Sequence, residues 1–236
     1  MATAQVKTES SSLAEKVAEI WRSDIRSGEL TPGSQLDFER YREQFAVSNT
    51  PLRDASKLLE TEGLVRIVPR RGVFVADVNT TTLLEAYVIR IALEPLVVSL
   101  ATPLVPLDRI KATRQEYRGA EAMKRSTERY QRLLDIDHLI HDLVLEFCPN
   151  KRLTKIMSDN SSYIDWCRNV VARRVEGAME PTIPEHIALC DAIIARDARG
   201  AADRMREHLI ATQNRLISSA AIEYHVKRPL KKVSHS

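Results

Sequence analysis

The spacing of the apolar residues is the feature that most constrains the fold of this chain, because it changes period only once. Over most of the sequence apolar side chains recur every three or four positions, which is typical of amphipathic helices. Within residues 65–78, VRIVPRRGVFVADV, they alternate instead, on both sides of a Pro69–Gly72 turn. The pattern predicts one small β-hairpin in a mostly α protein and separates a short N-terminal unit from a larger all-α unit near residue 78.

Capping and turn signals divide the helical pattern into segments. Ser12 and Glu15 form a capping-box sequence, and Thr50 followed by Pro51 is typical of a helix start. We expect a loose segment over residues 1–10, a winged unit over 11–77, an all-helical bundle over 80–222 and a basic tail over 226–236. The predicted helices span residues 12–28, 37–45, 50–62, 80–101, 107–124, 127–147, 151–175, 184–196 and 198–222.

The formal net charge of +3 says little about partners because of where the charge lies. The tail after residue 225 carries four basic residues and no acid, while residues 1–79 carry 11 basic and 12 acidic residues. With 44% hydrophobic and 28% charged residues, the composition is that of a globular protein. No apolar run suits a membrane span or a signal core, and the three cysteines show no CxxC spacing. We therefore expect a cytoplasmic protein with free thiols and no membrane partner.

The N-terminal unit has the element order of a winged helix-turn-helix. Two short helices flank a three-residue turn and a hairpin follows, and in such motifs the second helix enters the major groove of double-stranded DNA. Asn49 can pair bidentately with adenine, and Arg53 with guanine or phosphate. The candidate DNA-contacting residues are Ser48, Asn49, Thr50, Arg53, Arg70, Arg71 and Gly72. The alternative is that SNTPLRDA only caps a helix and that Arg53 pairs with a nearby acid.

Residues 25–75 resemble the DNA-binding domain of the GntR family of bacterial transcription regulators. The match runs in order through GEL-PG-L, VS-TP-R, L-EGLV and P-RG-FV. The resemblance implies operator contacts from Ser48, Thr50, Arg53 and the wing around Arg71 and Gly72. Asn49 stands where the family usually has arginine, and DFERYR replaces a PERELA-like helix. These departures indicate an operator unlike the family's usual one, with an A·T pair favoured opposite Asn49.

Four side chains of the helical unit suggest a metal site. Asp137 and His141 are four residues apart in DHLIH, which would place them on one helical face, and His186 and His208 lie on later predicted helices. One carboxylate and three imidazoles suit a divalent Zn, Ni, Mn or Fe ion. The alternative is that each is an ordinary core or surface residue. Three neighbours could serve in their place, namely Asp135, His138 and Asp142.

Residues 80–222 resemble the helical FCD effector domain of the FadR branch of the same family. The matching pieces are RIALE, D-x-x-x-H before CPNKRL, EHIALCDAIIARDARGAADRM and EHL. The resemblance implies a divalent metal held by Asp137, His141, His186 and His208, and a small organic acid as effector. Arg90 stands where the family often has an arginine that reaches the pocket. From the residues alone, Arg90 and Glu94 are equally well an i,i+4 ion pair.

Together these patterns predict a metabolite-responsive transcription regulator, a repressor by family habit, that binds operator DNA as a homodimer. Two recognition helices are needed for two half-sites of a near-palindrome. One alternative is a metal-dependent, hydrolase-like enzyme, since an open metal site can activate water. No separate general base is apparent, however, and an enzyme leaves residues 25–75 unexplained, so we expect no enzymatic activity. A second alternative is a regulator whose metal is purely structural.

Overall fold

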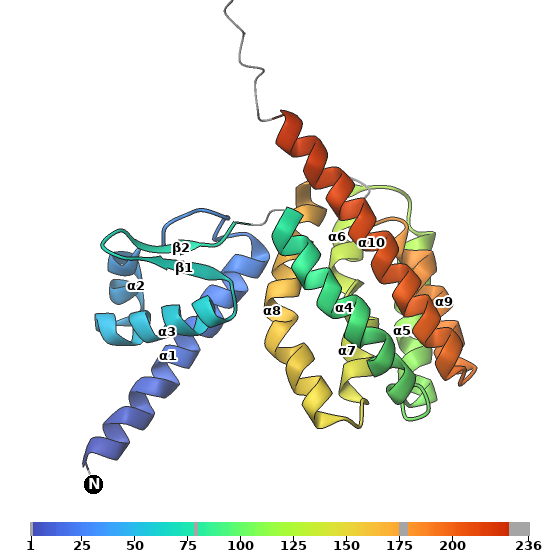
Figure 1. The fold of residues 1–236 in the computed structure, drawn as a ribbon, viewed down its shortest axis with the longest axis horizontal. Coiled ribbons are helices and arrows are strands. Elements are labelled where there is room, and N and C mark those ends of the chain that lie inside the picture. The colour runs from blue at the N-terminus through green and yellow to red at the C-terminus, as the bar shows by residue number, and fades with distance from the viewer. Residues whose placement is uncertain (1, 78–79, 175–178, 227–236) are drawn as a thin grey trace, which may run out of the picture. The chain divides into compact units, whose positions relative to one another are not determined.

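The computed structural model describes residues 2–77, 80–174 and 179–226, which form two compact units (Figure 1). One unit comprises Met1–Val78 together with Ser158–Val170, and the other comprises Asn79–Met157 together with Val171–Ser236. The mostly helical fold class is confirmed, with a two-stranded hairpin as the sheet of the described residues. The predicted boundary at residues 78–79 and the tail beyond Val226 lie outside the described residues.

The first unit contains helices α1 (Ala2–Ser27), α2 (Phe38–Phe45) and α3 (Asn49–Thr61), followed by strands β1 (Val65–Val68) and β2 (Gly72–Val75). Helix α1 packs against α3. Trp21 of α1 is fully buried and meets Tyr41 of α2 edge-on, with ring centroids 5.2 Å apart. Leu52 and Leu59 present the buried face of α3 to the same core. Helical spacing in the sequence therefore becomes a three-helix core beneath a hairpin.

Two helix starts differ from the sequence prediction. Helix α1 begins at Ala2, where a loose segment and a start at Ser12 were expected. Residues 2–12 include several good helix formers and no glycine or proline, so the backbone can continue helically beyond the apolar stripe. Helix α3 begins at Asn49 with Ser48 as N-cap, so Thr50 is not the cap. Pro51 then falls in the first turn, where its missing N–H costs no helical hydrogen bond.

The hairpin pairs Val65 with Val75 in antiparallel register around the predicted turn. Gly72 has φ +115°, and a Cβ there would lie 2.6 Å from Gln35 Nε2. That amide donates a hydrogen bond of 2.9 Å to the Arg71 carbonyl, and Gln35 also forms an isolated bridge with Phe74. Glycine at position 72 thus leaves room for Gln35 to bind the hairpin. The sequence could not predict this pairing, because one isolated bridge residue produces no alternating pattern.

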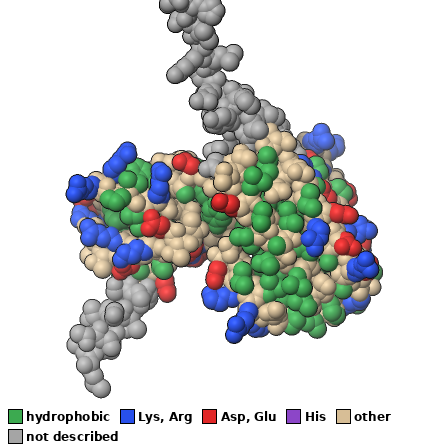
Figure 2. Space-filling model, viewed as in Figure 1, with side chains coloured by type: hydrophobic (Ala, Val, Ile, Leu, Met, Phe, Trp, Pro, Cys, Tyr) green, Lys and Arg blue, Asp and Glu red, His purple; other side chains and the backbone are tan. Residues whose placement is uncertain are grey.

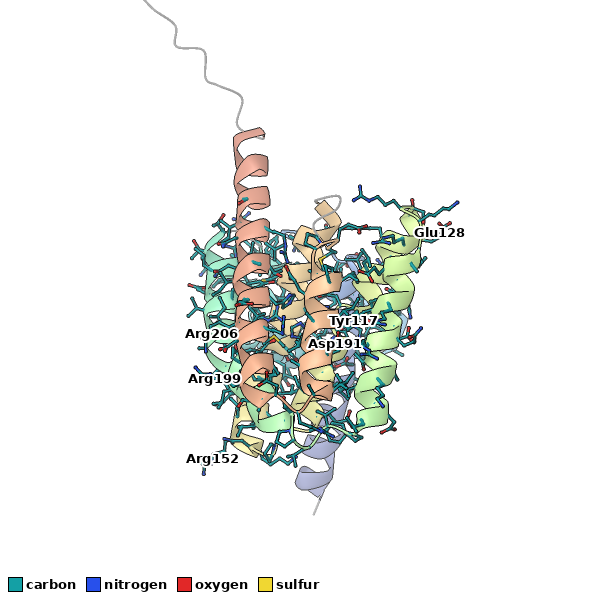
Figure 3. The ribbon with its side chains drawn as sticks, turned by 90° about the vertical axis from the view of Figure 1, so that its right-hand side faces the viewer. Tyr117, Glu128, Arg152, Asp191, Arg199 and Arg206 are labelled. Carbon is teal, nitrogen blue, oxygen red and sulfur yellow. The ribbon has the colours of Figure 1, made fainter. Side chains whose placement is uncertain are left out.

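The second unit contains helices joined by turns, with no strand among its described residues. Its helices are α4 (Thr80–Ala101), α5 (Leu107–Ala122), α6 (Thr127–Ile136), α7 (Leu139–Glu146), α8 (Lys151–Arg174), α9 (Thr182–Ile194) and α10 (Ala198–Val226), with the middle of α8 grouped in the first unit. Helix α10 packs against α4 and α9, and α9 against α5. Figure 3 shows α10, α9 and α5 side by side. No described helix is long and apolar enough to cross a bilayer.

The single helix predicted over 127–147 is wrong, since the chain breaks between α6 and α7. No glycine or proline marks the break. Instead the Ile140 amide donates to the buried Tyr117 hydroxyl of α5, 3.0 Å away. A side chain that accepts a backbone N–H in place of the carbonyl four residues earlier interrupts the helix. Asp137 therefore ends α6 while His141 lies in α7, so the two residues belong to two helices and not to the single helix predicted for them.

Candidate nucleic-acid interface and candidate metal site

The start of α3 presents a row of exposed polar side chains. Ser48, Asn49 and Thr50 are all exposed, and the Ser48 hydroxyl makes no capping hydrogen bond. Arg53 is exposed one turn later and has no acidic partner among the described residues, while Asp54 beside it pairs with Lys57 at 3.0 Å. The alternative in which an acid neutralises Arg53 is therefore not what the structure has. These groups are accessible for phosphate oxygens and base edges.

A groove of about 850 Å³ lies between α3, the start of α2 and the hairpin. Arg53, Lys57 and Arg70 line it with three cations, and Asp37 and Glu39 add two acids at the α2 side. Lys and Arg side chains gather on this side of the first unit (Figure 2). Three of the predicted residues, Arg53 of α3 and Arg70 and Gly72 of the wing, thus line one concave surface, although the unit as a whole is slightly acidic.

Three histidines from three helices converge in the second unit. His141 of α7, His186 of α9 and His208 of α10 each place one possible ligand nitrogen within 4.8 Å of the other two. The Nε2 atoms of His186 and His208 are 3.2 Å apart. Asp137, at the end of α6, has Oδ1 4.0 Å from His186 Nδ1. The structure therefore brings all four predicted residues together from four separate elements.

Two carboxylates contact the Nδ1 atoms of two of these rings. His208 Nδ1 lies 2.6 Å from Glu185 Oε2, and His141 Nδ1 lies 2.6 Å from Glu94 Oε2. Burial alone would raise the pKa of both glutamates, but bonded histidines and arginines hold each pKa below its usual value. Burial also lowers the pKa of His208. The site thus combines ionised carboxylates with a neutral His208 imidazole, the form that binds metals.

The residues present fit a borderline divalent cation. His141 Nε2 is buried and has no hydrogen-bond partner within the described part of the chain, as expected of a nitrogen kept for a ligand. A carboxylate and three imidazoles are also the donor types that such ions prefer. The alternative trio does not join them, since Asp135 bonds Gln131 and His138 is a half-buried partner of Asp142.

Comparisons with known proteins agree with both units. Residues 13–75 match the family model of the bacterial regulatory proteins of the gntR family, and residues 85–211 match the FCD domain. The chain belongs to the GntR family and carries an FCD domain. Proteins of this type are DNA-binding transcriptional regulators rather than enzymes.

Relatives named as HTH-type transcriptional regulators align with most of the chain. The regulator YdhC of Bacillus subtilis is 24% identical over 191 residues, which is 80% of this chain and 83% of the relative. The repressor GlaR of Escherichia coli is 26% identical over 199 residues, 80% of this chain and 89% of its own. A GntR regulator structure from Rhodococcus sp. RHA1 has a TM-score of 0.73 at 21% identity, and covers 88% of this chain and 98% of its own. At that identity the structural likeness shows the fold alone.

Within the FCD domain Arg90 is more constrained than the sequence suggested. It is 2% exposed, and its Nε donates to Glu94 Oε1 at 2.5 Å. Its Nη2 also lies 3.3 Å from His141 Nδ1, which places it at the edge of the histidine cluster. The i,i+4 pair with Glu94 therefore exists, but it is buried beside the candidate metal site and is not a surface pair.

Sequence reasoning missed the supporting residues of the FCD site. Glu185 directly precedes His186 in PEHIALC, and Arg215 holds it through two hydrogen bonds of 2.8 and 3.0 Å. Tyr117 packs its ring against His186, with centroids 4.9 Å apart (labelled in Figure 3). The adjacency of Glu185 to a candidate ligand was the available signal, whereas nothing local connects Tyr117 or Arg215 to the site.

Proposed function

We propose that this regulator is a metabolite-responsive repressor that binds operator DNA as a homodimer and carries a divalent metal with a small carboxylate effector in its FCD domain. The observation that supports the metal and effector most strongly is the convergence of Asp137, His141, His186 and His208. Within this cluster the buried His141 Nε2 has no hydrogen-bond partner among the described residues. The groove between α3 and the wing supports Arg53, Arg70 and Gly72 as DNA-contacting residues.

On the DNA side, α3 would enter the major groove with Asn49 and Arg53 at base edges. Ser48 and Thr50 are short donors at a helix N-terminus, which favours a phosphate. Arg70, Arg71 and Gly72 would meet the backbone or the neighbouring minor groove from the wing. This division assigns sequence choice to α3 and register to the wing.

On the effector side, the four ligands would hold a Zn, Ni, Mn or Fe ion. When bound, such an ion supplies positive charge and an open coordination position that attract a carboxylate oxygen. Arg90 adds a buried positive charge beside His141. The effector can release the operator only if it binds the DNA-bound and free arrangements with different affinity.

A mobility-shift experiment on the DNA upstream of the protein's own coding sequence tests this function. We expect retardation that weakens with salt, because phosphate contacts release counterions. We also expect a carboxylate from a thermal-shift screen to reverse it, and EDTA treatment to remove that reversal. Absence of retardation at every salt concentration below ~0.1 M would overturn the operator-binding proposal.

The exposed face of α4 supports a second copy of the chain as its partner. Val88 is 62% exposed and Leu84 and Leu96 are 40% and 48% exposed, on a helix that is apolar around much of its surface. Figure 2 shows hydrophobic side chains over the region where α4 lies in Figure 1. Exposed apolar patches of this kind mark association sites, and two half-sites call for two copies.

Val88→Glu is expected to convert the dimer to a monomer, since a charge in a symmetric interface faces its own image and loses its hydration. Light scattering after size-exclusion chromatography measures the mass, and fluorescence anisotropy measures operator affinity. Leu107→Glu, on the exposed start of α5, is the control and should stay dimeric. A Val88→Glu protein that remains dimeric would show that α4 is not the interface.

A further inference from the structure

We propose that Glu185 and Glu94 are positioning residues that fix the proton position of His208 and His141, so that the ring nitrogens facing the cluster can bind a divalent metal. The inference deepens the proposed function and rests on its metal site. It assigns roles to two glutamates and to the arginines behind them, none of which would touch the metal.

Glu185 holds His208 through a short and well-anchored contact. Its Oε2 is 2.6 Å from His208 Nδ1, and both carboxylate oxygens accept hydrogen bonds from Arg215. Arg215 Nη2 also donates to Thr212 Oγ1 at 2.7 Å, one turn earlier on α10. Two side chains of α10 thus fix Glu185 of α9 at both oxygens, so the orientation of the His208 ring is set by the packing of two helices.

The chemistry of this contact determines where the proton on His208 lies. A neutral imidazole carries one N–H and one lone pair, and an ionised carboxylate can only accept. The His208 proton must therefore sit on Nδ1, which leaves the Nε2 lone pair directed at His186, 3.2 Å away. Metal-binding histidines characteristically donate their second N–H to such a carboxylate, which orients the ring and raises its basicity.

The second pair builds the same arrangement from different elements. Glu94 of α4 accepts from His141 Nδ1 of α7, and Arg90 donates to Glu94 from one turn earlier. His141 Nε2 is then the free acceptor, and it is the buried nitrogen that has no partner among the described residues. Two glutamate–arginine pairs therefore direct two lone pairs into one cluster, which an ordinary buried histidine would not require.

Glu185 gives the sharper test, because its side chain is 25% exposed while Glu94 is 8% exposed beside a buried Arg90. Removal of Glu94 would leave that arginine as an uncompensated buried charge and endanger folding. Glu185→Gln keeps the shape and an oxygen that can accept the Nδ1–H, whereas Glu185→Ala removes both. Glu146→Gln is the matched control, since Glu146 is exposed and pairs with Arg109 at 2.9 Å.

The experiment measures the Zn²⁺ dissociation constant of full-length, metal-stripped protein by competition with a chromophoric chelator. We expect Glu185→Ala to weaken Zn²⁺ binding about 10- to 100-fold, the usual cost of losing a residue that hydrogen-bonds a metal ligand. Glu185→Gln should recover part of that loss, and Glu146→Gln should stay within about twofold of the wild type. Visible absorption of Co²⁺-loaded protein should also change in Glu185→Ala, because the His208 ring is no longer held.

Melting curves of the metal-free variants separate positioning from folding. If Glu185→Ala does not fold, Glu185→Gln and its Co²⁺ spectrum carry the test. If the wild type binds Zn²⁺ and both Glu185→Ala and Glu185→Gln bind it as tightly as the wild type does, the positioning role is overturned and the metal site stays in place. Wild-type protein that binds neither Zn²⁺ nor Co²⁺ would overturn the metal part of the proposed function itself, and this inference with it.

Discussion

Replacing His208 with alanine is expected to weaken metal binding by a factor on the order of 100 or more. This is a larger effect than the loss of a residue that only hydrogen-bonds a metal ligand. His208 is 4% exposed and lies between Glu185 and His186, so alanine there removes one of the three converging imidazoles from a buried site. Elemental analysis after purification, and Zn²⁺ competition on stripped protein, measure the loss.

The same variant distinguishes a sensing metal from a structural one. Loss of bound metal should lower the melting temperature, because a ligand held at 1,000 times its dissociation constant stabilises by about 4 kcal/mol. In a sensor, His208→Ala should still bind the operator but fail to release it with the carboxylate. His138→Ala is the control, since half-buried His138 follows Asp137 in the sequence but pairs with Asp142. Equal metal content in His208→Ala and His138→Ala would show that the cluster does not hold the ion.

Arg53→Ala is expected to weaken operator binding at least tenfold and to leave metal content unchanged. Arg53 is exposed on α3 with no acidic partner among the described residues, so its guanidinium is available for a bidentate contact. One such contact is worth about 1–3 kcal/mol of discrimination between bases, and a homodimer would lose it at both half-sites. Fluorescence anisotropy against the operator and a scrambled duplex measures affinity and specificity together.

Arg26→Ala serves as the matched control for Arg53→Ala. Arg26 is a half-buried arginine of the same unit, on α1 near Glu19, and it does not line the groove between α3 and the wing. Its loss should change operator affinity by less than about twofold. If the two variants weaken binding equally, Arg53 contributes only general charge, and the base contact assigned to it is wrong.

The first unit could be predicted closely because its signals are local. The alternation in residues 65–78 and the left-handed tip at Gly72 are properties of consecutive residues, and the hairpin forms where they place it. The predicted three-residue turn after α2 likewise begins at Ala46, whose left-handed φ of 52° ends the helix. The start of α1 was missed because helix propensity continues where the apolar stripe stops, so periodicity alone places the boundary too late.

The histidine cluster could be predicted from the sequence only in part. The residue types of the candidate ligands, and a family resemblance, identified Asp137, His141, His186 and His208, but the single helix predicted to carry Asp137 and His141 was wrong. Tyr117, more than twenty residues earlier, takes the Ile140 amide and breaks the helix between them. The role of those four residues toward a metal stays a prediction, while their proximity is a property of the structure.

By itself, the sequence determined the elements of this protein and the chemical types available to it: a helical chain with one wing, an exposed polar start to α3, and three imidazoles with carboxylates. The tertiary structure alone decided which of those groups meet. Asp137 lies at the end of α6, and His141, His186 and His208 lie on α7, α9 and α10, so their distances depend on how the helices pack. The pairing of Glu185 with Arg215 and of Glu94 with His141 is decided in the same way, because side chains 30 and 47 residues apart come into contact only when the core has closed.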